Sequence, residues 1–176
     1  LLFLNISRSE RSVNQIIPIV IEIAQNCFVP FTVGGGIKNP NDAAALFEAG
    51  ADKVLINSIS YTNLDYITEI ASIHGKQAVT IGIDVKKNDN NEYKLFSNCG
   101  ENLESISLDD HLKSIIAAGA GEILIQSIDL DGTMGGYDDD LIKFVVNNSS
   151  VPIIVAGGAG DFLHIKKAFD EGEKHP

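Results

Sequence analysis

The sequence has few cysteines and few basic residues. Cys27 and Cys99 are its only cysteines, and their spacing fits neither a metal site nor a disulfide framework. We interpret both as free thiols in a reducing cytoplasm, because disulfides are rare there. Only 13 lysines and arginines stand against 24 aspartates and glutamates, which gives a net charge of −11. This balance argues against nucleic acid as a partner, because phosphate neutralisation requires clustered basic side chains.

Long apolar runs are absent as well. No stretch reaches the roughly 18 apolar residues of a membrane span, so we expect no membrane association. The short apolar start, Leu1–Ile6, lacks a basic leader and a cleavage site, which argues against a signal peptide. The chain has no initiator methionine and opens within this strand-like run, so we expect that an N-terminal part is missing. The composition, 44% hydrophobic and 21% charged, is that of an ordinary globular domain.

Short apolar runs alternate with stretches of helical period. Runs rich in Val, Ile and Leu without strict alternation are typical of strands buried on both faces of a parallel sheet. The resulting βαβα order predicts a parallel α/β fold. The expected strands are Leu1–Ile6, Phe31–Val33, Lys53–Ile56, Ala78–Ile83, Glu122–Ile125 and Pro152–Val155. The expected helices are residues 12–26, 40–49, 63–74, 108–118, 138–147 and 161–171, with N-caps at Asn39 or Asn41 and at Asp161.

Two segments 122 residues apart resemble each other. Val29–Gly36 reads VPFTVGGG and Val151–Gly158 reads VPIIVAGG, and four βα units separate the two copies. Duplication of four units gives the eight of a (β/α)8 TIM barrel, and twice the offset is close to its typical length of roughly 250 residues. We therefore predict a single, partial TIM-barrel domain over residues 1–176, with about six βα units and the first and last units missing. The alternative, an open doubly wound sheet, predicts no such duplication.

The two copies end in glycine clusters, which contain Gly35 and Gly36 in the first copy and Gly157 and Gly158 in the second. Glycines between a strand and a helix let the backbone approach an anion, which the N–H groups of the helix N-terminus can bind. Two such sites would suit a small molecule with a phosphate at each end. The alternative is a pair of tight turns without a ligand.

Further polar residues follow predicted strands. Asp84 follows Val79–Ile83, and a carboxylate at this end of a barrel strand suggests acid–base catalysis. The alternative is a structural aspartate that caps a helix or pairs with the lysines beside it. Asn57 and Ser58 follow Lys53–Ile56 and are candidate substrate contacts, or ordinary turn formers.

The loop after Glu122–Ile125 contains Asp129, Asp131, Gly132 and Thr133. The Gly-Thr pair could contact a phosphate while the aspartates fix the loop or a substrate hydroxyl. A purely structural Asx-turn is the alternative, and an EF-hand is excluded because its later ligands are absent.

Other polar segments suggest no chemistry. Residues 86–103 predict a small hairpin with an Asn/Asp turn. The four histidines form no catalytic triad and no ligand set, so we expect them to face solvent and predict neither a metal site nor a cofactor. They are His74, His111, His164 and His175.

Together these motifs resemble one family over nearly the whole chain and in the right order. It is the family of the cyclase subunit (HisF) of imidazole glycerol phosphate synthase, in the HisA/HisF group of ribulose-phosphate-binding barrels. The related isomerase of the same pathway does not usually combine Asp-Gly-Thr with a following Gly-Tyr-Asp. The matching segments are Phe31–Ile37, Gly50–Val54, Ile56–Asn57, Ile83–Lys86, Gly119–Leu124, Ser127–Thr133, Gly136–Asp138 and Gly157–Gly160.

The resemblance implies a lyase of histidine biosynthesis. In that family, ammonia from a partner glutaminase (HisH-like, in a heterodimer) travels through the barrel. It attacks a bis-phosphorylated ribulosyl formimino carboxamide ribonucleotide, which yields imidazole glycerol phosphate and aminoimidazole carboxamide ribonucleotide. Asp84 matches one of two acid–base aspartates, and the other would lie on an upstream strand. Lys53 and Glu122 match two members of the charged ammonia gate, and the glycine clusters and Asp131–Thr133 match phosphate loops.

Some features depart from the family pattern. Asn5 replaces a usual aspartate, although an amide can still form hydrogen bonds, and the tail after Gly172 does not match.

Residues 27–30 and the predicted hairpin also resemble a paralogous branch that works with an amidotransferase on a surface-polysaccharide sugar. A third alternative is an inactive barrel fragment, because open sheet edges invite pairing with another chain. We expect the isolated 176-residue chain to be inactive.

Overall fold

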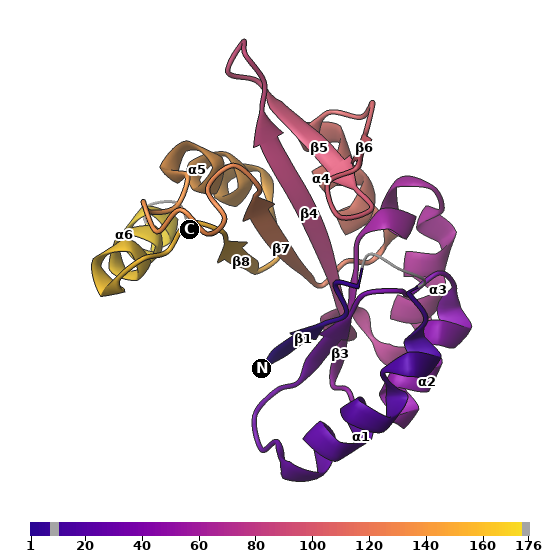
Figure 1. Ribbon diagram of the computed structural model, residues 1–176. Coiled ribbons are helices and arrows are strands. Elements are labelled where there is room, and N and C mark those ends of the chain that lie inside the picture. The colour runs from indigo at the N-terminus through magenta and orange to yellow at the C-terminus, as the bar shows by residue number, and fades with distance from the viewer. Residues whose placement is uncertain (8–10, 174–176) are drawn as a thin grey trace. The chain divides into compact units, whose positions relative to one another are not determined.

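The computed structural model describes residues 1–7 and 11–173, which form two compact units (Figure 1). The first unit comprises Leu1–Ile81 and Ala117–Gly121. The second comprises Gly82–Ile116 and residues 122–173. Strand β4 (Val79–Lys87) and helix α4 (Leu108–Ala118) each contribute residues to both units.

The first unit contains parallel strands, each followed by a helix. Strands β1, β2, β3 and the start of β4 pair in that order, and Val33 lies opposite Val54 in the register. The strands are β1 (Leu2–Leu4), β2 (Thr32–Gly34) and β3 (Lys53–Ile56). The helices are η1 (Val13–Gln15), α1 (Ile17–Asn26), α2 (Pro40–Glu48), η2 (Ser58–Tyr61), α3 (Leu64–His74) and η3 (Lys76–Ala78).

The core of this unit lies between the strands and the apolar faces of α2 and α3. Leu46 of α2 and Ile67 of α3 are fully buried, as are Val33 and Val54 on the strands. Continuous apolar strands of this kind are expected where both faces of a parallel sheet are covered. Helix α2 begins where its sequence predicts, because the Asn39 side chain accepts a hydrogen bond from the Asp42 N–H at 3.1 Å.

The second unit combines a hairpin with two further strand–helix pairs. The end of β4 pairs antiparallel with β5 (Tyr93–Ser97), and β5 pairs antiparallel with β6 (Asn102–Leu103). Strands β7 (Glu122–Ser127) and β8 (Ile153–Ala156) are parallel neighbours. Helix α5 (Asp139–Asn148) lies beside α6 (Phe162–Glu173). Lys143 of α5 forms an ion pair with Glu171 of α6 at 3.4 Å.

The six predicted strands and six predicted helices are all present among the described residues, and so is the hairpin. The largest error in a predicted strand end is at β4. Asp84 does not terminate β4, because the strand continues through Lys87 and Asp84 lies opposite Phe96 of β5. The polar residues after Asp84 look like a loop in sequence, but hydrogen bonds to β5 keep them extended.

The predicted solvent exposure of the histidines is only partly correct. His111 of α4 is 1% exposed, so its predicted exposure to solvent is wrong, and burial lowers its pKa to about 4. His74 is partly exposed and stacks on Phe47 at 4.0 Å between ring centroids. His164 lies in the first turn of α6, and His175 lies outside the described residues.

Stability should depend on pH through His111. An unfolded chain protonates this side chain near pH 6.5, whereas the folded chain resists protonation down to about pH 4. Because the unfolded state binds more protons between these values, the free energy of unfolding should fall as the pH is lowered from 6.5 to 4. Urea unfolding across this range should show a smaller fall in a His111→Gln variant. Equal falls in the two proteins would contradict this account.

Candidate functional site

The predicted site residues divide between the two ends of the strands. Two residues begin strands, namely Lys53 in β3 and Glu122 in β7. The candidate substrate contacts instead follow the carboxyl ends of strands, where ligands bind in parallel α/β folds. They are Gly35 and Gly36 after β2, Asn57 and Ser58 after β3, Asp129–Thr133 after β7, and Gly157 and Gly158 after β8.

The first glycine loop requires glycine for two reasons. Gly35 has a φ of +90°, in a region that favours glycine, and a Cβ there would lie 2.3 Å from the carbonyl oxygen of Asn5. The chain after β1 runs against this loop, since the Asn5 N–H donates to the Gly34 carbonyl at 2.9 Å. The Asn5 side chain accepts from the Ser7 N–H at 3.2 Å, so the amide that replaces the usual aspartate forms a local hydrogen bond.

The second glycine loop repeats this arrangement. Gly157 has a φ of +88°, and a Cβ there would lie 2.5 Å from the carbonyl oxygen of Ser127 at the end of neighbouring β7. In both loops the first residue after a strand therefore abuts a carbonyl at or just after the end of the adjacent strand. The 122-residue repeat in the sequence thus extends to the backbone geometry.

Side chains already engage some N–H groups at the start of the helices that follow. At α2, the N–H groups of Lys38 and Asp42 donate to side-chain oxygens at 2.8 and 3.1 Å. At α6, the His164 N–H donates to Asp161 at 3.1 Å, which confirms Asp161 as a capping residue, and the Gly160 N–H donates to His164 Nδ1. A bound anion would therefore have to be held by other backbone N–H groups of the two loops.

The loop after β7 is braced by its own polar side chains. Asp131 accepts from Gln126 Nε2 at 3.1 Å, and the Thr133 hydroxyl donates to the Leu130 carbonyl at 2.7 Å. Asp129 accepts from the backbone N–H of Lys87 at 3.0 Å and pairs with Lys86 at 3.6 Å. These bonds give the aspartates the loop-fixing role that the sequence suggested, while Gly132 and Thr133 remain exposed at the tip.

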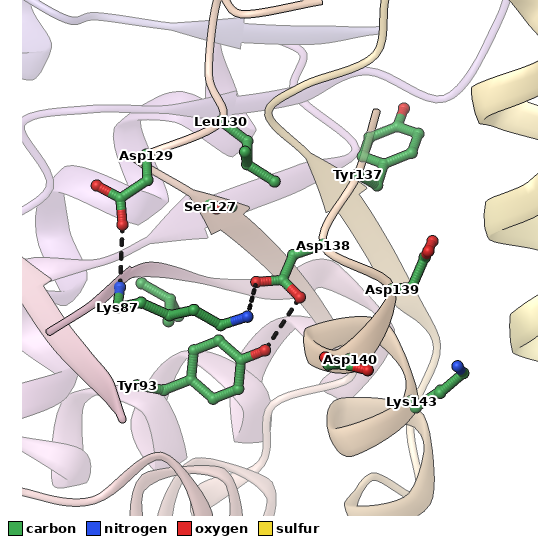
Figure 2. Close-up of a pocket in the computed structure, with 11 residues that line it drawn as sticks. Lys87, Tyr93, Ser127, Asp129, Leu130, Tyr137, Asp138, Asp139, Asp140 and Lys143 are labelled. Atoms are coloured by element: carbon green, nitrogen blue, oxygen red, sulfur yellow. Dashed lines mark hydrogen bonds and ion pairs between the residues drawn. The ribbon is translucent and has the colours of Figure 1, made fainter. Parts of the chain in front are cut away.

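A pocket of about 370 Å³ opens beside this loop (Figure 2). Its lining comes from β4, β5, β7 and the start of α5, and includes Val85, Lys87, Tyr93, Ser127, Asp129, Tyr137, Asp138 and Lys143. Lys87, Tyr93 and Asp138 were not among the predicted site residues. The available signals in the sequence were the position of Asp138 at the start of a predicted helix and the alternating apolar pattern around Tyr93.

Lys87, Tyr93 and Asp138 meet within this pocket. Asp138 receives the Lys87 ammonium at 3.1 Å and the Tyr93 hydroxyl at 3.0 Å. Burial alone would lower the pKa of Lys87, but the hydrogen bonds and charge of Asp138 and Tyr93 raise it overall. Burial raises the pKa of Tyr93 to about 12, although Lys87 opposes the rise and Asp138 supports it. At neutral pH both partners of Asp138 therefore keep the protons that they donate.

The pocket lies on the opposite face of β4 from Asp84. Side chains alternate along a strand, and it is Val85 and Lys87 that line the pocket. Asp84 and Lys86 therefore point to the other face. Asp84 is partly buried.

Comparison with known proteins identifies the family. The family model described as "Histidine biosynthesis protein" matches residues 1–175. Subunit HisF of imidazole glycerol phosphate synthase from Dictyoglomus thermophilum is 41% identical over 172 residues, which are 98% of this chain and 68% of that protein. The HisF subunits from Natranaerobius thermophilus and a Thermotoga species are 41% and 42% identical, again over 98% of this chain and 68% of theirs.

The chain belongs to the histidine biosynthesis protein family. The predicted resemblance to its HisF branch is confirmed, and so is the fold, an incomplete (β/α)8 barrel. The assignment to an enzyme of histidine biosynthesis, a cyclase of the lyase class, is confirmed with them. Within residues 1–7 and 11–173, no helix is long and apolar enough to cross a membrane. The same residues contain no group of three or more His, Cys, Asp or Glu side chains arranged to hold a metal ion.

The close approach at Gly157 predicts a large cost for a methyl group. Gly157→Ala should lower the free energy of unfolding by about 2–4 kcal/mol, because it combines an unfavourable φ with a clash against the backbone. Gly132→Ala is the matched control, since Gly132 has a φ of +75° but no atom within 4 Å of the place that a Cβ would occupy. It should cost only about 1 kcal/mol. Urea unfolding measures both, and equal losses would refute the steric argument.

Proposed function

We propose that the chain forms the cyclase of imidazole glycerol phosphate synthase and uses ammonia to close the imidazole ring. Its substrate would be the bis-phosphorylated ribulosyl formimino carboxamide ribonucleotide, and its products imidazole glycerol phosphate and aminoimidazole carboxamide ribonucleotide. The observation that best supports this substrate is the repeated glycine loop, at Gly35 and at Gly157, with the same close backbone approach in each copy. Two such loops would suit a substrate with a phosphate at each end.

Each loop would bind one phosphate of the substrate. Gly35 and Gly36 would offer backbone N–H groups to one phosphate, and Gly157 and Gly158 to the other. The exposed tip of the loop after β7, with Gly132 and Thr133, would add contacts to the second phosphate. Asn57 and Ser58 follow β3 and would contact the body of the substrate.

Asp84 would move protons during ring closure. When ammonia attacks a carbonyl carbon, protons must leave the nitrogen and reach the oxygen, which departs as water. A partly buried carboxyl on a barrel strand can accept and return such protons, and positioned groups of this kind contribute about 10²–10⁴-fold to rate. Asp84 is held by antiparallel pairing with β5, so its backbone position is fixed.

Ammonia would enter at the opposite end of the strands. Lys53 and Glu122 begin β3 and β7, so they lie at the amino ends, whereas the substrate loops lie at the carboxyl ends. We assign to them the role of a charged gate toward a HisH-like glutaminase subunit, which would release ammonia from glutamine. The relatives are subunits of imidazole glycerol phosphate synthase, which supports the existence of a partner subunit.

The proposed reaction can be tested with the full-length polypeptide, ammonium salt and the bis-phosphorylated substrate. Asp84→Asn should reduce kcat by at least about 100-fold, because the amide cannot exchange protons. Asp89→Asn, the same substitution at an exposed position of the hairpin, should leave kcat unchanged.

Retained turnover in Asp84→Asn would remove Asp84 from the mechanism. A folded wild-type protein that binds phosphate esters but forms no imidazole product would contradict the histidine reaction. That result would favour the paralogous branch that acts on surface-polysaccharide sugars.

A further inference from the structure

One residue, Lys87, contacts both ends of the loop that follows β7. This loop, residues 129–138, begins at Asp129, which accepts from the Lys87 backbone N–H at 3.0 Å. It ends at Asp138, which pairs with the Lys87 ammonium at 3.1 Å. Figure 2 shows the two bonds on either side of the Lys87 side chain. The last residue of β4 therefore joins the two ends of a ten-residue loop.

Asp138 also accepts hydrogen bonds from residues other than Lys87. Its carboxylate also accepts from the Leu141 N–H at 3.1 Å, which caps α5, and from the Tyr93 hydroxyl at 3.0 Å. The Asp138 side chain is only 11% exposed. One carboxylate thus connects the end of the loop to α5, to β4 and to β5.

The tip of the same loop is exposed and has left-handed backbone conformations. Gly132 and Met134 have φ angles of +75° and +58°, and Met134 is 71% exposed. The bonds of Thr133 to Leu130 and Gly135 are local and do not reach the rest of the unit. Between its ends, the loop is also held by the Gly136 N–H, which donates to the Gly158 carbonyl at 2.8 Å, and by Gln126, which donates to Asp131 at 3.1 Å. The bonds to Lys87 fix its two ends.

We propose that Lys87 and Asp138 are positioning residues that close the loop 129–138 and thereby hold Gly132 and Thr133 where the substrate phosphate binds. We refer to Lys87, Asp129 and Asp138 together as the loop clasp. The Lys87 side chain lies on the face of β4 opposite to Asp84, so it supports substrate binding without touching the reacting atoms. This inference rests on the proposed function, because it assigns the loop tip to a substrate phosphate.

Two substitutions weaken the clasp while they preserve its other bonds. Lys87→Met removes the ammonium but keeps the backbone N–H that donates to Asp129. Asp138→Asn removes the charge, yet asparagine still serves as an N-cap for α5. Lys87→Arg restores the charge. Lys94→Met is the matched control, because Lys94 lies on the same hairpin but pairs with exposed Glu92 outside the pocket.

The first measurement is amide hydrogen exchange of residues 130–137 in the full-length polypeptide. Opening of the loop should accelerate exchange by about tenfold or more in Lys87→Met and Asp138→Asn. Lys87→Arg and Lys94→Met should exchange like the wild type. Unchanged exchange in both weakened variants would overturn the clasp, and this result does not depend on turnover.

The second measurement is steady-state kinetics with the bis-phosphorylated substrate. Lys87→Met should raise KM by about tenfold and change kcat by less than about threefold, because a displaced loop weakens binding and leaves Asp84 in place. Lys87→Arg should return KM toward the wild-type value. A loss of kcat at constant KM, or no kinetic change despite faster exchange, would refute positioning.

The hydrogen-exchange and kinetic measurements distinguish a failure of this inference from a failure of the proposed function. If the wild-type protein forms no imidazole product, the proposed function fails while hydrogen exchange still decides whether the clasp closes the loop. If Lys87→Met does not fold, Asp138→Asn provides the same test with the α5 cap retained.

Discussion

A backbone carbonyl lies where a side chain would begin at both Gly35 and Gly157. In each case the first residue after a strand packs against a carbonyl at or just after the end of the adjacent strand, at 2.3 and 2.5 Å from the position of a Cβ. The turn from strand to helix can be this tight only with glycine, since the φ angles are also positive. The tight turn leaves backbone, rather than side chains, at the carboxyl end of the strand. A net charge of −11 is therefore compatible with an anionic substrate, because backbone N–H groups can bind phosphate without lysine or arginine.

A different kind of bond organises the second unit. Asp138, Lys87 and Tyr93 are distant in sequence and meet at one partly buried carboxylate. Removal of one partner from such a pair is costly, because it leaves the other charge without compensation. The cluster attaches the hairpin to the start of α5, and the backbone of Lys87 attaches it to Asp129. The strand that carries Asp84 is thus connected to the loop that carries Gly132 and Thr133, although Asp84 and the Lys87 side chain point to opposite faces of β4.

Local pattern predicted much of this structure, and tertiary contacts explain the rest. Lys53–Ile56 was predicted with its observed ends, because a buried parallel strand is a continuous apolar run flanked by polar residues. Asn39, one of two candidate caps at α2, is the observed cap, and such a cap is predictable because its side chain bonds within its own turn. The end of β4 was misplaced, because Lys86 and Lys87 are extended only through pairing with β5. His111 was expected in solvent, since residue type alone does not reveal that its helix face is buried. The contact of Lys87 with Asp138, 51 positions along the chain, leaves no signal in local sequence.

The central claim, that both glycine loops bind phosphate, is tested most directly by nuclear magnetic resonance of the full-length polypeptide. The amide signals of Gly35, Gly36, Gly157 and Gly158 would be followed during titration with inorganic phosphate, with chloride at equal ionic strength as the control. We expect saturable shifts at both loops with phosphate and none with chloride. Shifts confined to other parts of the chain, or to only one of the two loops, would contradict a substrate held by a phosphate at each end.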